Sequence, residues 1–131
     1  MFSKKEVDYL NSNRLARIAT VSSGKQPDVT PVGFRFDGER FVISGQRIEK
    51  TRKYKNVRKG DLKVGLVIDD LESVSPWKPR AIKIYGIAEI ENIDGRNTLV
   101  IKPPTHWSWG IETEPFDGGK QVIRKVEHEH S

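Results

Sequence analysis

Cysteine is absent from this chain of 131 residues, which excludes disulfides, a thiol nucleophile and cysteine-ligated metals. Long hydrophobic runs are absent too, since no apolar stretch approaches the roughly 18 residues of a membrane span. The opening residues, MFSKKEVDYL, lack the apolar centre of a signal peptide. These absences suit the reducing cytoplasm, and we expect a cytoplasmic protein with no membrane partner.

Sequence motifs of side-chain catalysis are missing as well. The chain has no nucleophile elbow, no P-loop and no dinucleotide glycine fingerprint. His106 is more typical of packing or of a surface than of a catalytic base. His128 and His130 fall in the tail EHEHS, which we expect to be frayed rather than metal-binding. We therefore predict no catalytic side chain and no metal site. If the protein is an enzyme, a bound cofactor supplies the chemistry.

The composition indicates one domain with a modest core. Hydrophobic residues make up 35% of the chain and charged residues 31%, so the surface is strongly ionic. The length is that of a single domain, which we expect to span residues 1–131. A core of this size would gain burial from self-association.

The hydrophobic pattern predicts a mainly β protein with short helices. Ser3 and Glu6 form a capping box that begins one short helix. Strands are predicted at residues 15–21, 28–36, 40–44, 63–68, 81–90 and 98–101, with a further candidate at 121–126. The strand at 63–68 should stop at Asp69-Asp70, whose carboxylates are expected on opposite faces. Turn signals between these short strands favour an antiparallel barrel, closed or partly closed.

The positive charge is concentrated in residues 41–60, FVISGQRIEKTRKYKNVRKG. This stretch holds seven cations and one acid, a net of +6, whereas the whole chain carries +5. The cations are Arg47, Lys50, Arg52, Lys53, Lys55, Arg58 and Lys59, and the acid is Glu49. The basicity of the protein is therefore local to one segment.

A short helix within this segment offers a use for the charge. Thr51 is a good N-cap, and Gly60 is a good stop. Arg52 and Lys53 then fall in the first turn, where backbone N–H groups already create positive potential and a cation is unfavourable. An anion held by those N–H groups, the Thr51 hydroxyl and the two side chains would remove the conflict, so a phosphate site is one interpretation. The other is a solvated basic helix, which most such charge runs form.

A basic strip on a small barrel is also compatible with nucleic-acid binding. Single-strand binders, however, stack bases on exposed strand aromatics, and here Phe34, Phe36 and Phe41 alternate as core residues. We therefore expect a small-molecule ligand and no nucleic acid. Binding that falls steeply with salt and ignores flavin would favour the nucleic-acid alternative.

Four segments, taken in order, resemble one protein family. They are RLARIATVSSGKQPDVTPVGFRFDG, TRKYKNVRKGDLKVGLVIDD, PWKPRAIKIYGIAEI and the SWG of residues 108–110. Together they resemble the pyridoxamine-5′-phosphate-oxidase-like, FMN-binding split barrels, and most closely the branch that uses the deazaflavin coenzyme F-420. The resemblance implies a six-stranded antiparallel split β-barrel. It also implies a homodimer with F-420 or FMN at the subunit interface.

The resemblance implies roles for particular residues as well. Thr30, Pro31 and Val32 would line the flavin or deazaflavin ring, and Ser44 would lie near the sugar-like chain and phosphate. The residues that would bind the phosphate or the acidic tail of the cofactor are Lys50, Thr51, Arg52, Lys53 and Asn56. Arg80 and Trp109 would reach the cofactor of the neighbouring subunit.

Two departures from the family pattern bear on the activity. The usual Asn-Pro pair after the basic helix is Gly60-Asp61 here. The C-terminal arginine that grips the substrate phosphate in pyridoxamine phosphate oxidase has no convincing counterpart in residues 110–131. That particular activity is therefore not expected.

The implied function is hydride transfer between F-420, or FMN, and a small organic acceptor that the sequence does not identify. Both cofactors carry a ribityl phosphate, and F-420 adds a lactyl-polyglutamate tail. Cations beyond those needed for one phosphate, such as Arg47, Lys55 and Arg58, favour the longer anion. A storage or sensing protein with the same site and no turnover is the alternative function.

Overall fold

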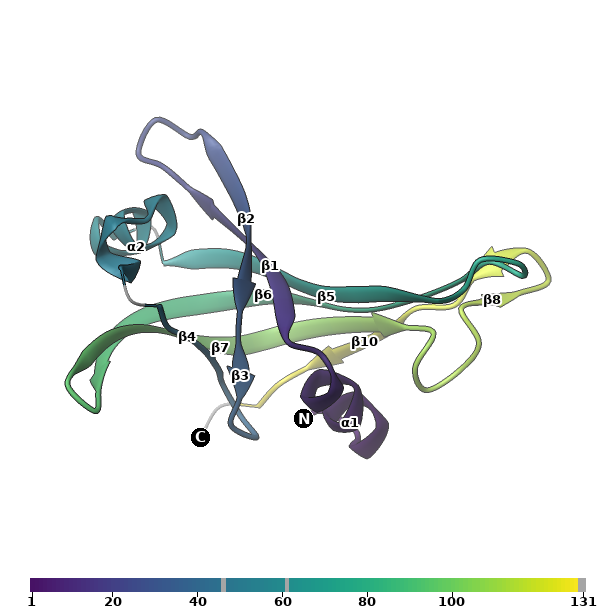
Figure 1. Ribbon diagram of the computed structural model, residues 1–131. Coiled ribbons are helices and arrows are strands. Elements are labelled where there is room, and N and C mark those ends of the chain that lie inside the picture. Colours follow the sequence, from purple (N-terminus) through teal and green to yellow (C-terminus); the bar gives the residue numbers. More distant parts are fainter. Residues whose placement is uncertain (46, 61, 130–131) are drawn as a thin grey trace.

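The computed structural model describes residues 1–45, 47–60 and 62–129. Most of this chain forms one eight-stranded antiparallel sheet, ordered β2-β1-β5-β6-β7-β4-β3, with β10 paired to β7 (Figure 1). Its strands are β1 Leu15–Val21, β2 Pro27–Gly33, β3 Arg35–Phe36, β4 Phe41–Ile43, β5 Lys63–Ser73, β6 Lys78–Ile93, β7 Arg96–Trp109 and β10 Arg124–Glu127. A separate small hairpin consists of β8 Phe116–Asp117 and β9 Lys120–Gln121, and the helices are α1 Lys4–Ser12, the 3-10 turn η1 Ile48–Lys50 and α2 Arg52–Arg58.

The sheet curls because one chain segment pairs at both of its edges. Only Phe34 separates β2 from β3, yet β2 pairs with β1 and β3 pairs with β4. This bent segment joins the two edges of the sheet, so six chain segments make up the barrel: β1, β2 with β3, β4, β5, β6 and β7. The expected antiparallel split barrel with short helices is confirmed. None of the helices in the described ranges is long and apolar enough to cross a membrane.

The core follows from the alternation of side chains along each strand. In β1, Ala16, Ile18 and Thr20 are buried, while the residues between them are exposed or half-buried. Ile18, Leu66 and Ile84 belong to one buried cluster that lies inside the curled sheet. Side chains at the other positions of β1, β5 and β6 point to the outer side of the sheet.

The strand predicted to stop at Asp69-Asp70 runs on to Ser73, so that prediction is wrong. Asp69 pairs with Arg17 at 2.5 Å, and Asp70 accepts two hydrogen bonds from Arg80 at 2.6 and 2.9 Å. The two carboxylates do point to opposite faces, as expected. Because cations on neighbouring strands neutralise both of them, the acidic pair does not end the strand.

The strand predicted at residues 98–101 also runs further, through two prolines to Trp109. Pro103 and Pro104 fall where the register between β6 and β7 shifts, opposite the bulge at Gly86. An irregularity of this kind breaks the regular pairing, so prolines, which lack an N–H group, are tolerated there. The register shift at Gly86 explains why the prolines do not break β7.

The C-terminal tail is docked rather than frayed over the residues that the structure describes. Within the predicted strand at 121–126, residues 124–126 lie in β10, which pairs with β7. The backbone N–H of His128 donates to the carbonyl of Pro104 at 2.8 Å. His130 lies outside the described residues. The expectation of a frayed tail is therefore wrong as far as His128.

Candidate functional site

Helix α2 begins and ends as the sequence predicts. The Thr51 hydroxyl accepts from the N–H of Tyr54 at 3.4 Å, which makes Thr51 the N-cap. Gly60, just past the helix, has a left-handed φ of 103° that suits glycine. The same Thr51 hydroxyl donates to the carbonyl of Ile48 at 2.6 Å. Its proton is thus already engaged, and a role for this hydroxyl in binding an anion stays a prediction.

Two polar residues of α2 face the barrel instead of solvent. Helix α2 packs against β1, and Asn56 donates from Nδ2 to the hydroxyl of Thr20 at 3.0 Å, with both side chains buried. Lys53 lies on the same helix and is only 9% exposed. Burial lowers the pKa of Lys53, and the neighbouring Asp28 opposes that shift.

The ammonium group of Lys53 has no ion-pair partner among the described residues. Within the same part of the chain, no fully buried side-chain nitrogen or oxygen lacks a hydrogen bond. The Lys53 stem is therefore buried while its Nζ reaches the surface, the arrangement by which long cationic side chains keep their charge in water. In this arrangement the Lys53 ammonium group is accessible to an anion.

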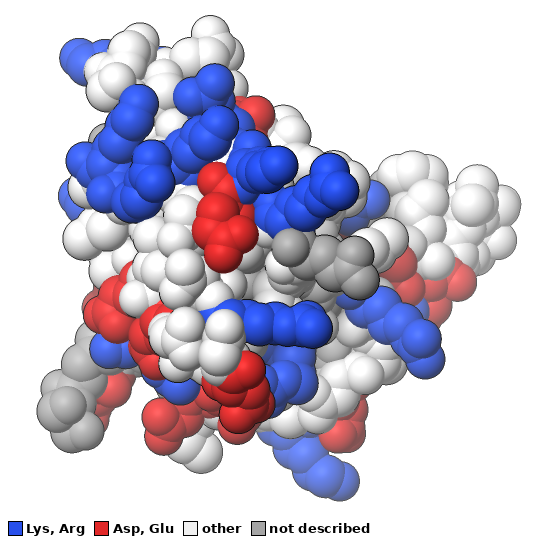
Figure 2. Space-filling model, turned by 60° about the vertical axis from the view of Figure 1, so that its left-hand side comes forward, with Lys and Arg blue, Asp and Glu red and all other residues white. Residues whose placement is uncertain are grey.

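The other cations of residues 41–60 lie near Lys53 in the chain. They too lack an ion pair with any carboxylate among the described residues. Figure 2 shows lysine and arginine side chains gathering over the end of the molecule where α2 lies, with few acids between them. They are Arg47, Lys50, Arg52, Lys55, Arg58 and Lys59. None of these side chains forms an ion pair with a carboxylate of residues 1–45, 47–60 and 62–129. We call these six residues, together with Lys53, the α2 cation cluster.

A groove of about 700 Å³ lies near the other end of the segment that leads into α2. Its walls come from the junction of β2 and β3, from β4, and from the β6–β7 hairpin. Ser44 lines it just after β4, together with Arg35 and Arg96 from opposite walls. Neither arginine forms an ion pair within the described ranges. Asp94 also lines the groove, which is therefore open and carries two cations and one carboxylate.

The residues predicted to line the ring lie in β2, next to this groove. Thr30 and Val32 pair with Ile18 and Ala16 of β1 and point inward, and Val32 is buried. Pro31, between them, is exposed on the outer side. The next residue, Gly33, belongs to the groove wall. One chain thus brings the predicted ring residues, Ser44 and the α2 cation cluster to the same half of the barrel.

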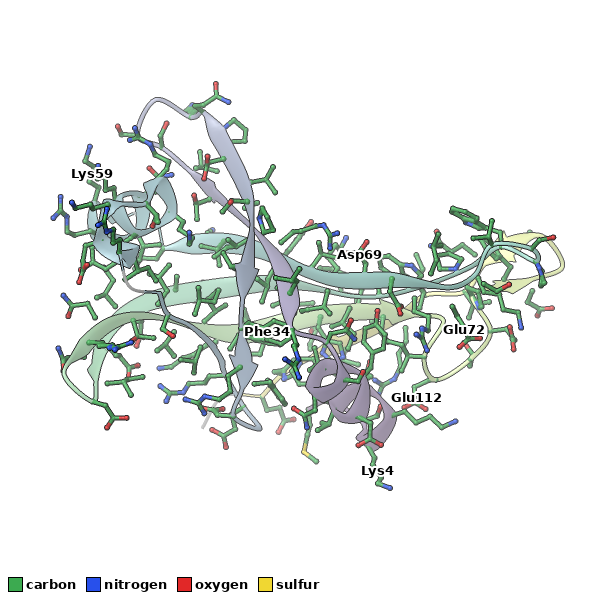
Figure 3. The ribbon with its side chains drawn as sticks, viewed as in Figure 1. Lys4, Phe34, Lys59, Asp69, Glu72 and Glu112 are labelled. Atoms are coloured by element: carbon green, nitrogen blue, oxygen red, sulfur yellow. The ribbon has the colours of Figure 1, made fainter. Side chains whose placement is uncertain are left out.

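Arg80 and Trp109 are not part of that grouping. Figures 1 and 3 show α2 and the labelled Lys59 at one end of the long strands, and the labelled Glu72 near the other. Arg80 starts β6 at that far end, where it pairs with Asp70 and Glu72 and lies 5.3 Å from the centre of the Tyr9 ring. Trp109 pairs in register with the next residue, Ala81. Within one chain, these two residues therefore lie away from the α2 cation cluster.

Sequence reasoning did not find the buried carboxylate of Glu6. This side chain, 0% exposed, accepts from Nε2 of His106 at 3.0 Å, from the Ser108 hydroxyl at 2.6 Å and from Arg124 at 2.6 Å. The Ser3 backbone N–H completes the set at 2.8 Å. Burial alone would raise the pKa of Glu6, but the hydrogen bonds from His106, Ser108, Ser3 and Arg124 together hold it well below its usual range.

The capping box was the one signal that could have pointed to Glu6, since it predicted the contact with Ser3. His106 is buried and stacks on Phe2 with ring centres 4.1 Å apart, so the packing interpretation holds for it. Its Nδ1 lies 2.6 Å from Nε2 of His128. The histidine is engaged on both ring nitrogens and faces no open cavity.

Comparison with known proteins decides the family. The sequence profile of the pyridoxamine 5′-phosphate oxidase family matches residues 2–124. This protein belongs to that family. A curated member, the 5a,11a-dehydrotetracycline/5a,11a-dehydrooxytetracycline reductase of Streptomyces rimosus, is 35% identical over 127 residues, with 89% of each chain covered. Membership, with a reductase among the relatives, supports a flavin-dependent oxidoreductase.

Solved structures of other proteins share the fold. An F420 reductase is similar with a TM-score of 0.58 at 20% identity, covering 73% of this chain and 90% of its own. An FAD-binding protein from Mycobacterium smegmatis also has a TM-score of 0.58, at 17% identity, covering 78% of this chain and 88% of its own. At these identities the likeness establishes the split barrel and nothing about the ligand.

Proposed function

We propose that this protein is an oxidoreductase that transfers a hydride between coenzyme F-420, or FMN, and a small organic acceptor. The family assignment supports the class of reaction. The cofactor, when bound, supplies the hydride chemistry. The chain supplies the anchor for the cofactor, its orientation and a surface for the acceptor. No side chain of this chain is assigned a proton-transfer or nucleophilic role.

The observation that carries the proposal is the state of Lys53. A lysine with a buried stem, a lowered pKa and no ion pair costs folding free energy that an exposed lysine would not. A phosphate or carboxylate placed against its Nζ would compensate that cost with a charge-assisted hydrogen bond. The residues present therefore fit the anionic part of either cofactor, with Arg52 and Lys50 beside it.

The extent of the α2 cation cluster favours F-420 over FMN. One phosphate is neutralised by two or three cations, and the cluster has seven members with no carboxylate paired to them among the described residues. The lactyl-polyglutamate tail of F-420 provides further negative charges that could follow this surface. Affinity for F-420 should consequently fall more steeply with salt than affinity for FMN.

The groove beside Ser44 is where we place the acceptor. It adjoins the β2 residues proposed to line the ring, and Arg35 and Arg96 can donate to carbonyl, enolate or carboxylate oxygens. Replacing Arg96 with Gln should raise KM for the acceptor while the affinity for cofactor stays unchanged. If the variant lost affinity for the cofactor to the same extent, the acceptor would not bind in this groove.

We also propose a homodimer with the cofactor at its interface. The outer side of the sheet exposes large apolar residues, with Leu15 60%, Val29 69% and Tyr85 58% exposed. A second copy covering this side would bury them and could carry its Arg80 and Trp109 toward the α2 cation cluster. Sedimentation should show a dimer, and Val29→Asp should shift it toward monomer.

The experiment that tests the function is titration of the purified protein with FMN and with F-420, followed by absorbance and fluorescence. We expect micromolar or tighter binding of at least one cofactor, weakened sharply by the charge reversal Arg52→Glu with Lys53→Glu. Absence of any spectral change with both cofactors would refute the proposal.

Turnover separates an enzyme from a storage or sensing protein with the same site. Bound reduced cofactor should be oxidised in stopped-flow experiments by a member of a panel of quinones, enones and tetrapyrroles. We would include 5a,11a-dehydrotetracycline, the substrate in the name of the Streptomyces relative. Binding without oxidation by any acceptor would favour storage or sensing.

A further inference from the structure

Glu6 ties together three parts of the chain that are distant in sequence. It lies in the first turn of α1, and its carboxylate accepts hydrogen bonds from His106 and Ser108 of β7 and from Arg124 of β10. The carboxylate is completely buried, as are His106 and Ser108, while the Arg124 side chain is 41% exposed. Charge-assisted hydrogen bonds in such surroundings hold their partners firmly in place.

The two β7 partners of Glu6 alternate with tryptophans. His106 and Ser108 are buried on the inner side of the strand, and Trp107 and Trp109, the residues that follow each, are half-buried on the outer side. Successive side chains of a strand point to opposite faces. Fixing His106 and Ser108 from within therefore fixes the orientation of both tryptophans on the outer side.

An aromatic and cationic group on the outer side depends on that orientation. The Trp107 ring centre lies 4.6 Å from that of Tyr85, and Lys83 places its Nζ 4.4 Å from the Trp107 centre. Lys125 of β10 adds a second ammonium at 5.8 Å from the same ring. Lys125 follows Arg124, the residue that bonds Glu6, so the same strand contributes to both sides.

His128 extends the attachment of the C-terminal segment. Nε2 of His106 faces the Glu6 carboxylate, and Nδ1 of the same ring lies 2.6 Å from Nε2 of His128. The backbone of His128 is held separately by the carbonyl of Pro104. The segment from Arg124 to His128 is thus attached to β7 through the Glu6 cluster at two points.

We infer that Glu6 is a positioning residue that sets Trp107 and Trp109 on the outer side of β7 and couples the C-terminal strand to them. The consequence of this positioning role for ligand binding, through Trp109, rests on the proposed function. The consequences for the orientation of the tryptophans and for the pairing of β10 are independent of that function.

The test uses tryptophan emission and backbone hydrogen exchange of the full chain. The chain has three tryptophans, and Trp77→Phe at the β5–β6 turn leaves only Trp107 and Trp109 to emit. In that background, Glu6→Gln should shift the emission to longer wavelength. It should also speed the exchange of the β10 amides by about tenfold or more, the effect of losing a hydrogen bond between charged groups.

Glu89→Gln is the matched control, because Glu89 is a half-exposed carboxylate on β6 that pairs with Lys102. It should change neither emission nor β10 exchange. A folded Glu6→Gln protein with the emission and exchange of its Trp77→Phe parent would overturn the inference.

A second pair of variants decides the matter if Glu6→Gln does not fold. Arg124→Gln removes one of the donors to Glu6 and should speed β10 exchange, whereas Lys125→Gln, one residue on and facing outward, should not. Arg124→Lys should restore slow exchange. Equal exchange in Arg124→Gln and Lys125→Gln would overturn the inference.

Cofactor titration of the same variants separates this inference from the proposed function. If cofactor binds, Glu6→Gln should weaken it several-fold while the α2 cation cluster is untouched. If no variant, including the parent, binds FMN or F-420, the proposed function fails, while emission and exchange still decide the role of Glu6.

Discussion

Glu6 and Lys53 are both charged side chains folded into the protein, and their surroundings are opposite. Glu6 accepts hydrogen bonds from three side chains and one backbone N–H, while Lys53 has no ion-pair partner among the described residues. The folded state holds the pKa of Glu6 below its usual range, which favours the charge. It lowers the pKa of Lys53, which disfavours the charge.

The difference separates a charge that stabilises the fold from one that the fold tolerates. A buried carboxylate with every oxygen satisfied joins α1, β7 and β10, so its removal should cost stability. A lysine with a buried stem and no ion pair among the described residues contributes nothing comparable, so its retention calls for another reason. In the proposed function that reason is an anionic ligand.

The largest expected effect is that of Glu6→Ala on stability. Removing the carboxylate leaves His106, Ser108 and Arg124 without their acceptor, and breaking a buried charged cluster in this way costs about 3–5 kcal/mol. Urea unfolding should report that loss in the free energy of unfolding. Glu89→Ala, on the surface, should stay within about 0.5 kcal/mol of the parent. A similarly small change in both variants would contradict the claim that the buried Glu6 carboxylate stabilises the fold.

The next largest expected effect is the loss of the stability that Glu6 contributes when the pH is lowered. Because its folded pKa lies below its unfolded value, the stabilisation is complete above about pH 4.3 and is lost as the pH falls from there toward the folded pKa. The free energy of unfolding should drop by up to about 1.4 kcal/mol per pH unit more in the parent than in Glu6→Gln. Asp37 and Asp70, whose pKa values are also lowered, contribute equally to both proteins. Parallel pH profiles would contradict this account of Glu6.

Asn56→Ala tests the other polar contact beside Lys53. It leaves the buried hydroxyl of Thr20 without its donor, and we expect a loss of about 1–2 kcal/mol in thermal or urea unfolding. Asn92→Ala, at an exposed position of β6, should change stability by less than about 0.5 kcal/mol. An equal loss of stability in Asn56→Ala and Asn92→Ala would show that the Asn56–Thr20 contact between α2 and β1 does not stabilise the fold.

The smallest expected effect on stability is that of Lys53→Met in the ligand-free protein. Methionine keeps the buried stem apolar and removes an ammonium that forms no ion pair within the described ranges, so stability should stay equal or rise by up to about 1 kcal/mol. Thermal unfolding without cofactor measures it. A loss of more than about 1 kcal/mol would mean that the ammonium stabilises the fold after all.

Local signals in the sequence predicted the parts of the fold that depend on neighbours in the chain. The run LARIATV was predicted as a strand, and β1 has the predicted bounds. The capping residues Ser3 and Thr51 are adjacent to the helices they begin. The ends of β5 and β7 were wrong because they depend on cross-strand partners, Arg17 and Arg80 for one and the Gly86 bulge for the other.

The same limit applies to the candidate site. Sequence reasoning found the α2 cation cluster, whose members are consecutive or nearly so. It did not distinguish Lys53 from Arg52, since only the packing of α2 on β1 decides which of the two is buried. It also did not find the side-chain partners of Glu6, which lie 100 to 118 residues away along the chain.

The most direct measurement compares the affinities of Lys53→Met and Lys59→Met for F-420 and FMN by fluorescence titration. The two variants remove the same charge from the same cluster, one with a buried stem and one fully exposed beyond the end of α2. If Lys53 is kept for an anionic cofactor, its variant should raise Kd by about tenfold or more, and the Lys59 variant by less than about threefold. Equal changes in Kd, or none in either variant, would contradict the account.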